Sequence, residues 1–179
     1  MEANEAQELK EQAEKGGENA LRPVAFTMSV LAVLVAVTTV LGHRTHTEAV
    51  LYQNKATDKW NEYQAKNIRR YNTSLASDLL SVAPISDKEK AEKLAKDYAD
   101  HRAKWDEDLK EDQNQARELE EKVDKAEVRA DHFDLGEALL EIGLVVTSVT
   151  LLTRRRAYWY TGFVFSLAGI ASVVWGFLL

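Results

Sequence analysis

The sequence predicts an all-α membrane protein with three transmembrane helices and a long extracytoplasmic helical hairpin, antiparallel and coiled-coil-like. Three observations predict this fold. Apolar residues are gathered into three blocks with few or no charges, two other segments carry apolar stripes at helical spacing, and a proline separates those two segments. The chain has 179 residues, a formal net charge of -6 and no cysteine. The absence of cysteine excludes a disulfide framework, a thiolate zinc site and a cysteine nucleophile.

The N-terminal segment, residues 1–22, is rich in acidic residues. A secretory signal peptide begins with a basic region, and a mitochondrial transit peptide is poor in acids, so the segment fits neither. We therefore expect an acidic cytoplasmic tail that leads into an uncleaved membrane anchor.

The first apolar block has no charged residue from Val24 to Gly42. A helix that spans a membrane needs about 20 apolar residues, so we assign residues 23–42 to the first transmembrane helix. Small residues recur on one face of it, a pattern that allows close helix packing in lipid: Ala25, Ser29, Ala32 and Ala36.

Residues 43–134 are predicted to form the two arms of the hairpin. Apolar stripes with steps of three or four residues, or with a heptad repeat, indicate one long helix in each arm. The first stripe is Ala49, Tyr52, Ala56, Trp60, Tyr63, Asn67, Tyr71, Leu75, Leu79 and Val82, with Asn67 its one polar member. The second is Ala91, Ala95, Tyr98, Trp105, Leu109, Ala116, Leu119, Val123, Ala126, Ala130 and Phe133, interrupted by Arg102 and Asp112.

The tip of the hairpin is expected near residues 83–87. The residue before Pro84 avoids the helical conformation, which ends the first arm. Ser86 and Glu89 then have the S-x-x-E spacing of a capping box, which begins the second arm. Two helices alone bury little of such long stripes, so we expect further copies of the chain to cover them in a homo-oligomer.

Two apolar blocks follow the hairpin. We assign residues 135–153 to the second transmembrane helix and residues 157–179 to the third. The third block also has small residues at helical spacing, and these predict a second packing face: Gly162, Ser166, Gly169 and Gly176.

The loop between the second and third helices, residues 154–156, consists of Arg154, Arg155 and Arg156. Short loops rich in arginine stay cytoplasmic. The loop and the N-terminus are therefore predicted inside, with residues 43–134 and the C-terminus at the outer face. Tyr158, Trp159 and Tyr160 follow the arginines and are typical of an interfacial aromatic belt.

Two stretches carry a resemblance to a known family. They are DKWNEYQAKNIR at residues 58–69 and HFDLGEALLEI at residues 132–142, the latter continuing to LTRR at residues 152–155. With the three-span layout, they resemble an uncharacterised family of bacterial membrane proteins, domain of unknown function 4337. The resemblance implies a location in the bacterial inner membrane, and it implies no activity.

No motif of enzymatic chemistry is present. The chain lacks a glycine-rich phosphate loop, a G-x-S-x-G elbow and an H-E-x-x-H zinc motif. A basic face for nucleic acid is also absent. We therefore predict that the protein is not an enzyme, binds no cofactor and binds no nucleic acid.

Three histidines are expected at the outer boundary of the membrane: His43, His46 and His132. Near the acids that flank His132, such imidazoles can bind a transition metal or respond to pH. They can equally face water and headgroups. We favour the second interpretation and assign no metal site.

Glu137 and Glu141 lie in the first turns of the second transmembrane helix, four residues apart and therefore on one helical face. They either reach the outer interface or face the interior of a bundle, where acids mark ion pathways.

The sequence leaves two functions open. The protein is either a structural or interaction protein that presents a helical stalk to an envelope partner, which we favour, or a homo-oligomeric cation-selective pore with an acidic ring at its outer mouth.

Overall fold

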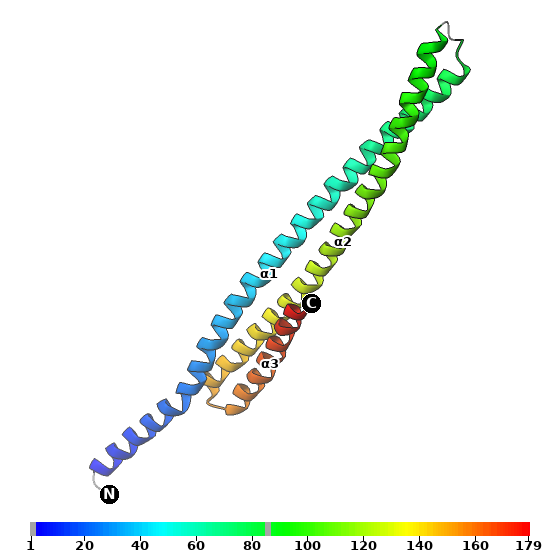
Figure 1. The fold of residues 1–179 in the computed structure, drawn as a ribbon. Coiled ribbons are helices and arrows are strands. Elements are labelled where there is room, and N and C mark those ends of the chain that lie inside the picture. The colour runs from blue at the N-terminus through cyan, green and yellow to red at the C-terminus, as the bar shows by residue number, and fades with distance from the viewer. Residues whose placement is uncertain (1–2, 85–86) are drawn as a thin grey trace. The chain divides into compact units, whose positions relative to one another are not determined.

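The computed structural model describes the backbone of residues 3–84 and 87–179, and the side chains of residues 21–84 and 87–179. These residues form three α-helices and no β-strand: α1 (Ala3–Val82), α2 (Lys88–Thr153) and α3 (Arg156–Leu178) (Figure 1). The predicted all-α class is confirmed. Within the described part of the chain, each of the three helices contains a stretch long and apolar enough to cross a membrane.

The chain divides into two compact units. The first, here called the three-helix unit, comprises Met1–Thr47 and Lys125–Leu179, and so contains the first part of α1, the last part of α2 and all of α3. The second, here called the two-helix unit, comprises Glu48–Asp124, which includes the rest of α1 and α2.

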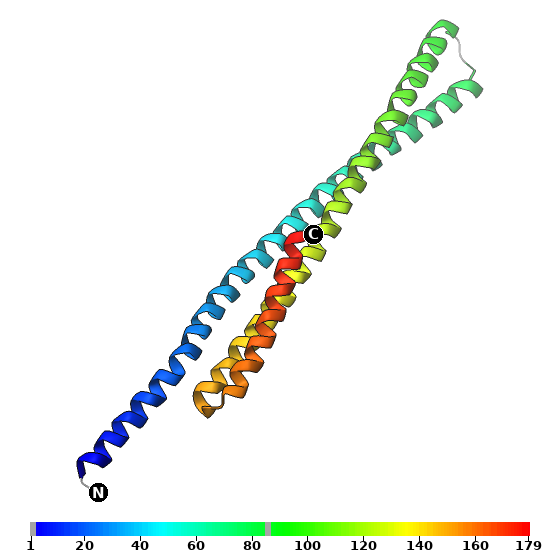
Figure 2. The ribbon, with the colours of Figure 1, turned by 60° about the horizontal axis from the view of Figure 1, so that its bottom comes forward.

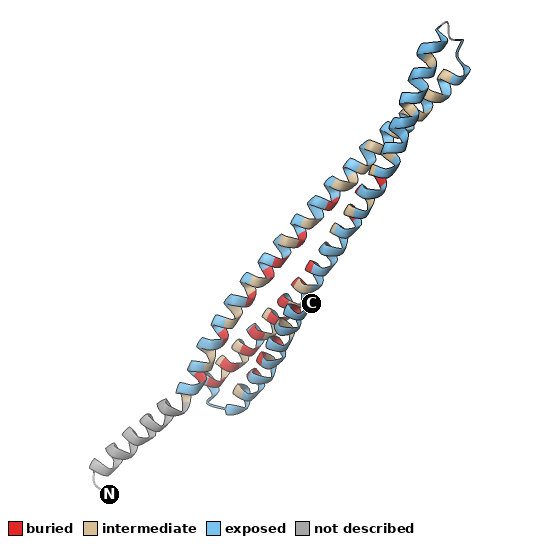
Figure 3. Cartoon of the chain, viewed as in Figure 1, coloured by how far each residue is buried: buried red, intermediate tan, exposed pale blue. Residues whose placement is uncertain are grey.

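In the three-helix unit, α3 lies along the last part of α2 in both views of the ribbon (Figures 1 and 2). The buried positions gather on the facing sides of the helices (Figure 3). From α2 they include Phe133 and Leu140, which are 2 % and 1 % exposed, and from α1 they include Val24 and Leu31. The ring of Phe133 also lies edge-on to Phe177 of α3 at 5.2 Å between centroids. Each helix therefore contributes one apolar face to a common core.

In the two-helix unit, α1 and α2 run antiparallel, as three polar pairs show: Trp60 with Glu120, Lys66 with Asp112, and Arg70 with Asp106. Small and aliphatic residues between the helices are buried: Ala49, Ala56, Leu109, Ala116 and Val123.

The break between α1 and α2 has a local cause at each side. The amide of Ala83 donates the last helical hydrogen bond of α1 to the carbonyl of Leu79 (3.0 Å), and Pro84 follows. At the start of α2, the carboxylate of Asp87 accepts a hydrogen bond from the amide of Lys90 (3.2 Å), as an N-cap residue does. Ser86, the capping residue that the sequence predicts, lies outside the described residues.

The turn from α2 to α3 is very short, because α2 ends at Thr153 and α3 begins at Arg156. Arg154 has a φ of 54°, in the left-handed region that a non-glycine residue rarely adopts. Its amide donates to the carbonyl of Thr150 (2.8 Å), which closes the helix C-terminus. Arg156, which the sequence placed in the loop, is the first residue of α3.

Candidate functional site

The contact between α2 and α3 is built from glycines on both helices. Gly143 faces Gly162, and Gly136 faces Gly169. A methyl group added at Gly162 would lie 2.8 Å from the carbonyl oxygen of Gly143, and one at Gly169 would lie 2.8 Å from that of Gly136. The two backbones therefore touch at these points, which only residues without a Cβ allow.

This contact uses the small-residue face that the sequence predicts on residues 157–179. Gly162, Ser166, Gly169 and Gly176 are all buried, and they pack against α2 of the same chain rather than against a second copy. The matching glycines of α2, Gly136 and Gly143, were missed from the sequence. Their separation of seven residues, which Gly162 and Gly169 share, was the available signal.

The small-residue face predicted on residues 23–42 is not covered by the other two helices. Ala25, Ser29, Ala32 and Ala36 are all exposed, while the buried side of the same stretch is formed by Val24, Leu31 and Thr38. Four small residues at helical spacing therefore form an unused face of the three-helix unit.

The two acids of α2 lie in different surroundings, although they are one turn apart. Glu137 is half-buried and accepts a hydrogen bond from the hydroxyl of Thr39 on α1. Glu141 is exposed, and no hydrogen bond or ion pair joins it to another described residue. The pair therefore does not act as one unit within a single chain.

The three histidines do not converge on one point. His46 Nε2 lies 2.9 Å from Asp134 Oδ2, and both side chains are half exposed. His43 is exposed, and the backbone carbonyl of His132 accepts a hydrogen bond from Ser172 (2.8 Å). Across residues 21–84 and 87–179, no group of three histidine, aspartate or glutamate side chains is arranged to hold a metal ion.

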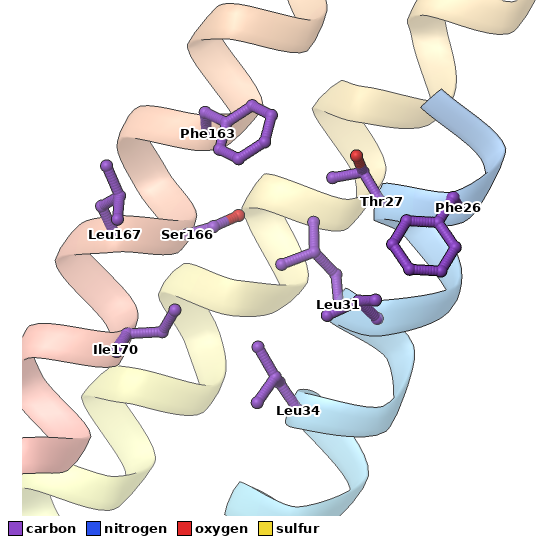
Figure 4. Close-up of a pocket in the computed structure, with 9 residues that line it drawn as sticks. Phe26, Thr27, Leu31, Leu34, Phe163, Ser166, Leu167 and Ile170 are labelled. Carbon is purple, nitrogen blue, oxygen red and sulfur yellow. The ribbon is translucent and has the colours of Figure 1, made fainter. Parts of the chain in front are cut away.

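A groove separates α1 from α3 on the surface of the three-helix unit. Figure 4 shows side chains from both helices along it, with α2 behind. Its volume is about 220 Å³, and it is lined by Phe26, Thr27, Val30, Leu31, Leu34, Phe163, Ser166, Leu167 and Ile170. At one end, the indole Nε1 of Trp159 donates a hydrogen bond to the hydroxyl of Thr27 (3.3 Å).

The two-helix unit contains a charged cluster around Asp112, which is only 4 % exposed. Lys66 Nζ lies 2.6 Å from Asp112 Oδ2, and Lys59 Nζ lies 3.9 Å from Asp112 Oδ1. Glu62 pairs with both lysines, at 2.9 Å and 3.1 Å. Asp112, which interrupts the apolar stripe of α2, is therefore paired with two lysines of α1.

The contacts in the cluster shift the pKa values of Lys59, Glu62 and Lys66. The hydrogen bond with Asp112 raises the pKa of Lys66 above its usual value, and the hydrogen bond with Glu62 does the same for Lys59. Hydrogen bonds from Lys59 and then Lys66 lower the pKa of Glu62. Each of these three shifts favours the charged form of the group concerned.

Long helices with membrane-length apolar stretches, packed through glycine contacts, define the class: an all-helical protein consistent with a multi-pass membrane protein. The family model described as Domain of unknown function (DUF4337) matches residues 20–179, and the chain belongs to this family. The resemblance noted in the sequence is thereby confirmed. Comparison with curated proteins and with solved structures gives no match.

Proposed function

We propose that the protein is a homo-oligomeric, multi-pass protein of the bacterial inner membrane that presents a coiled-coil-like helical hairpin outside the membrane as an interaction surface. It performs no enzymatic reaction. The N-terminus and the arginine loop are cytoplasmic, and the hairpin and the C-terminus lie at the outer face.

The observation that carries the proposal is the contrast between the two small-residue faces. The face on α3 is covered by α2. Ala25, Ser29, Ala32 and Ala36 of α1 are exposed among the residues whose side chains the structure describes. In lipid, such faces stabilise helix pairs through close van der Waals contact. A second copy brings an identical face and forms a symmetric contact.

A second observation supports an interaction surface on the hairpin. In the two-helix unit, the last part of the α1 stripe is exposed by 58 % to 78 % at each large residue: Tyr71, Leu75, Leu79 and Val82. Scattered apolar residues on a surface need no explanation, but a continuous stripe marks a contact surface. Another copy or an envelope protein can cover it.

Cysteine cross-linking tests the homo-oligomer, because the chain has no cysteine of its own. Ala32→Cys and Ala36→Cys should form disulfide-linked dimers when membranes are oxidised. Leu31→Cys, on the buried side of the same helix, is the matched control and should not. Absence of dimers at both positions would exclude this face as the contact between copies.

The orientation is tested separately with a membrane-impermeant thiol reagent. Ser86→Cys should be labelled in intact cells with a permeable outer membrane, and Asn4→Cys only after the inner membrane is opened. The reverse pattern would overturn the topology.

One observation favours a second candidate function, a cation-selective pore. Glu141 is an exposed carboxylate inside the apolar stretch of α2, and intramembrane acids are costly unless they meet water, a cation or a partner. Copies of Glu141 around an axis would form an acidic ring. In reconstituted vesicles, Glu141→Gln should then reduce cation flux, whereas a stalk protein shows no flux with either residue.

A further inference from the structure

We propose that the three-helix unit binds one anionic phospholipid, whose acyl chain lies in the groove between α1 and α3 and whose phosphate is bound by Arg154, Arg155 and Arg156. This inference rests on the membrane location proposed above.

The groove is suited to an acyl chain because its polar groups are already satisfied within the chain. The hydroxyl of Thr27 donates to the carbonyl of Pro23 (2.8 Å) and accepts from Trp159, and the hydroxyl of Ser166 donates to the carbonyl of Gly162 (2.8 Å). The remaining lining is aliphatic or aromatic, and Phe26 and Leu167 are 72 % and 62 % exposed. Within the groove itself, an occupant therefore gains free energy only by covering apolar surface.

The arginines lie at the end of the groove that Trp159 marks. The hydrogen bond between Trp159 and Thr27 places the first turns of α3 beside α1, and the three arginines come directly before those turns. All three are exposed. None pairs with a carboxylate of any residue whose side chain the structure describes.

Charge complementarity decides the nature of the occupant. Guanidinium groups bind phosphate through paired hydrogen bonds, and basic pockets between membrane helices recognise anionic headgroups. A second copy seated in the groove in the same orientation would place its own three arginines at this end, and cations cannot neutralise cations. An anionic lipid instead supplies the opposite charge at the arginines and an apolar chain at the groove.

The lipid site and the proposed oligomer face do not compete. At 100° per residue, Phe26, Val30 and Leu34 lie on one side of α1, whereas Ala25, Ser29, Ala32 and Ala36 lie on another. One face can therefore contact a second copy while the other holds lipid.

The test uses the full chain carrying Trp175→Phe, in detergent micelles, titrated with phosphatidylglycerol or phosphatidylcholine brominated on one acyl chain. Trp159 contacts the lining residues Thr27 and Phe163, so bromine in the groove should quench its fluorescence. We expect phosphatidylglycerol to quench at a concentration at least about fivefold lower than phosphatidylcholine, since each basic residue near a headgroup contributes about this factor.

Two variants separate the headgroup from the chain. Arg154→Gln with Arg155→Gln and Arg156→Gln should abolish the preference for phosphatidylglycerol, whereas Lys93→Gln with Lys96→Gln and Lys104→Gln, a charge-matched set in the two-helix unit, should keep it. If the triple arginine variant is not produced, Arg155→Gln alone should weaken the preference. Leu167→Phe should weaken quenching by both lipids by partly filling the groove, while Val164→Phe, exposed on α3 outside the groove, should not.

Equal quenching by the two lipids in the parent chain, or an unchanged preference in the arginine variant, would overturn the lipid site. A dimer whose dissociation accompanies the Leu167→Phe change would assign the groove to a second copy instead. The membrane location is measured in a separate experiment, as the retention of the chain in membranes washed at alkaline pH. Loss from washed membranes would contradict the proposed function, whereas retention without lipid preference would contradict only the lipid site.

Discussion

The hydroxyl of Thr39 on α1 lies within hydrogen-bond reach of two acceptors, the carbonyl of Val35 on its own helix and the carboxylate of Glu137 on α2. This contact joins two helices inside the three-helix unit at the level of the first acidic residue of α2. The carboxylate of Glu137, which would be costly to place unpaired in hydrocarbon, thus has a hydrogen-bond partner within the chain.

Thr39→Val should destabilise the three-helix unit, because it removes the donor and leaves Glu137 half-buried without this partner. Hydrogen bonds between membrane helices contribute about 0.6 to 1.7 kcal/mol, and we expect a loss in this range. Unfolding by SDS in mixed micelles, followed by circular dichroism, measures it. Thr47→Val is the control, since the Thr47 hydroxyl bonds only the carbonyl of His43 on its own helix. Equal losses in both variants would show that the contact with Glu137 contributes nothing.

Gly162→Ala should destabilise the contact between α2 and α3. The added methyl group would lie 2.8 Å from the carbonyl oxygen of Gly143, so the helices must separate. Overpacking of this kind costs about 1 to 3 kcal/mol. The same SDS titration reports the loss, and Ala168→Leu on the exposed side of α3 should have little effect. A Gly162→Ala protein as stable as the parent would contradict the close backbone contact.

Lys66→Met should destabilise the two-helix unit by about 1 to 3 kcal/mol, because the buried carboxylate of Asp112 loses its nearest cation. Replacing both partners, Lys66→Met with Asp112→Leu, should recover most of that loss, since no buried charge is then left unpaired. Hydrogen exchange of the amides around residues 59–66 and 109–116 measures the change. Arg69→Met, at an exposed position nearby, is the control. A double variant less stable than the single one would show that Asp112 stabilises the unit even without Lys66, for example through Lys59.

The same cluster predicts a dependence of stability on pH. The pKa of Lys66 is raised by Asp112, so its contribution is fully present below the usual lysine value of 10.5 and is lost as the pH rises through the folded value. The pKa of Glu62 is lowered, so its contribution is present above 4.5 and is lost as the pH falls through the folded value. Urea titrations between about pH 8 and pH 11 should show an alkaline loss that Asp112→Asn reduces. An identical loss in that variant would assign the effect to other groups.

Asp87→Ala should loosen the first turn of α2, because the Asp87 carboxylate accepts the hydrogen bond of the Lys90 amide. Loss of an N-cap costs about 1 kcal/mol. The amides of residues 88–91 should exchange faster with solvent. Asp100→Ala, at an exposed position in the interior of α2, should leave them unchanged. Faster exchange in neither variant would show that the cap does not hold this turn.

Some features of the site were predictable from residues that lie close together in the sequence. The small-residue face of α3 was visible as a spacing pattern, and the glycines of α2 could have been found by the same spacing. The spacing pattern does not predict which helix packs on the α3 face, because any helix with a complementary surface can do so. For this reason the assignment of Gly169 to packing within one chain came only from the structure.

Asp112 shows a similar limit in the two-helix unit. In the sequence it appears only as an interruption of an apolar stripe. Its cations, Lys66 and Lys59, belong to the other helix, and their distance from it depends on the register between the two helices. The register is set by how the two helices pack against each other, so a pattern within one helix cannot predict it.

The sequence by itself determined the all-α class and the membrane-length apolar stretches, because helix formation and hydropathy depend on residues within a few turns of each other. It also determined the membership in the family, since that rests on a match of residues along the chain. The tertiary structure alone decided that the α3 face is filled by α2 while the α1 face is exposed, and that Glu137 meets Thr39 while Glu141 is exposed. These outcomes depend on how each helix is rotated about its own axis against its neighbours. That rotation is set by contacts between residues far apart in the chain.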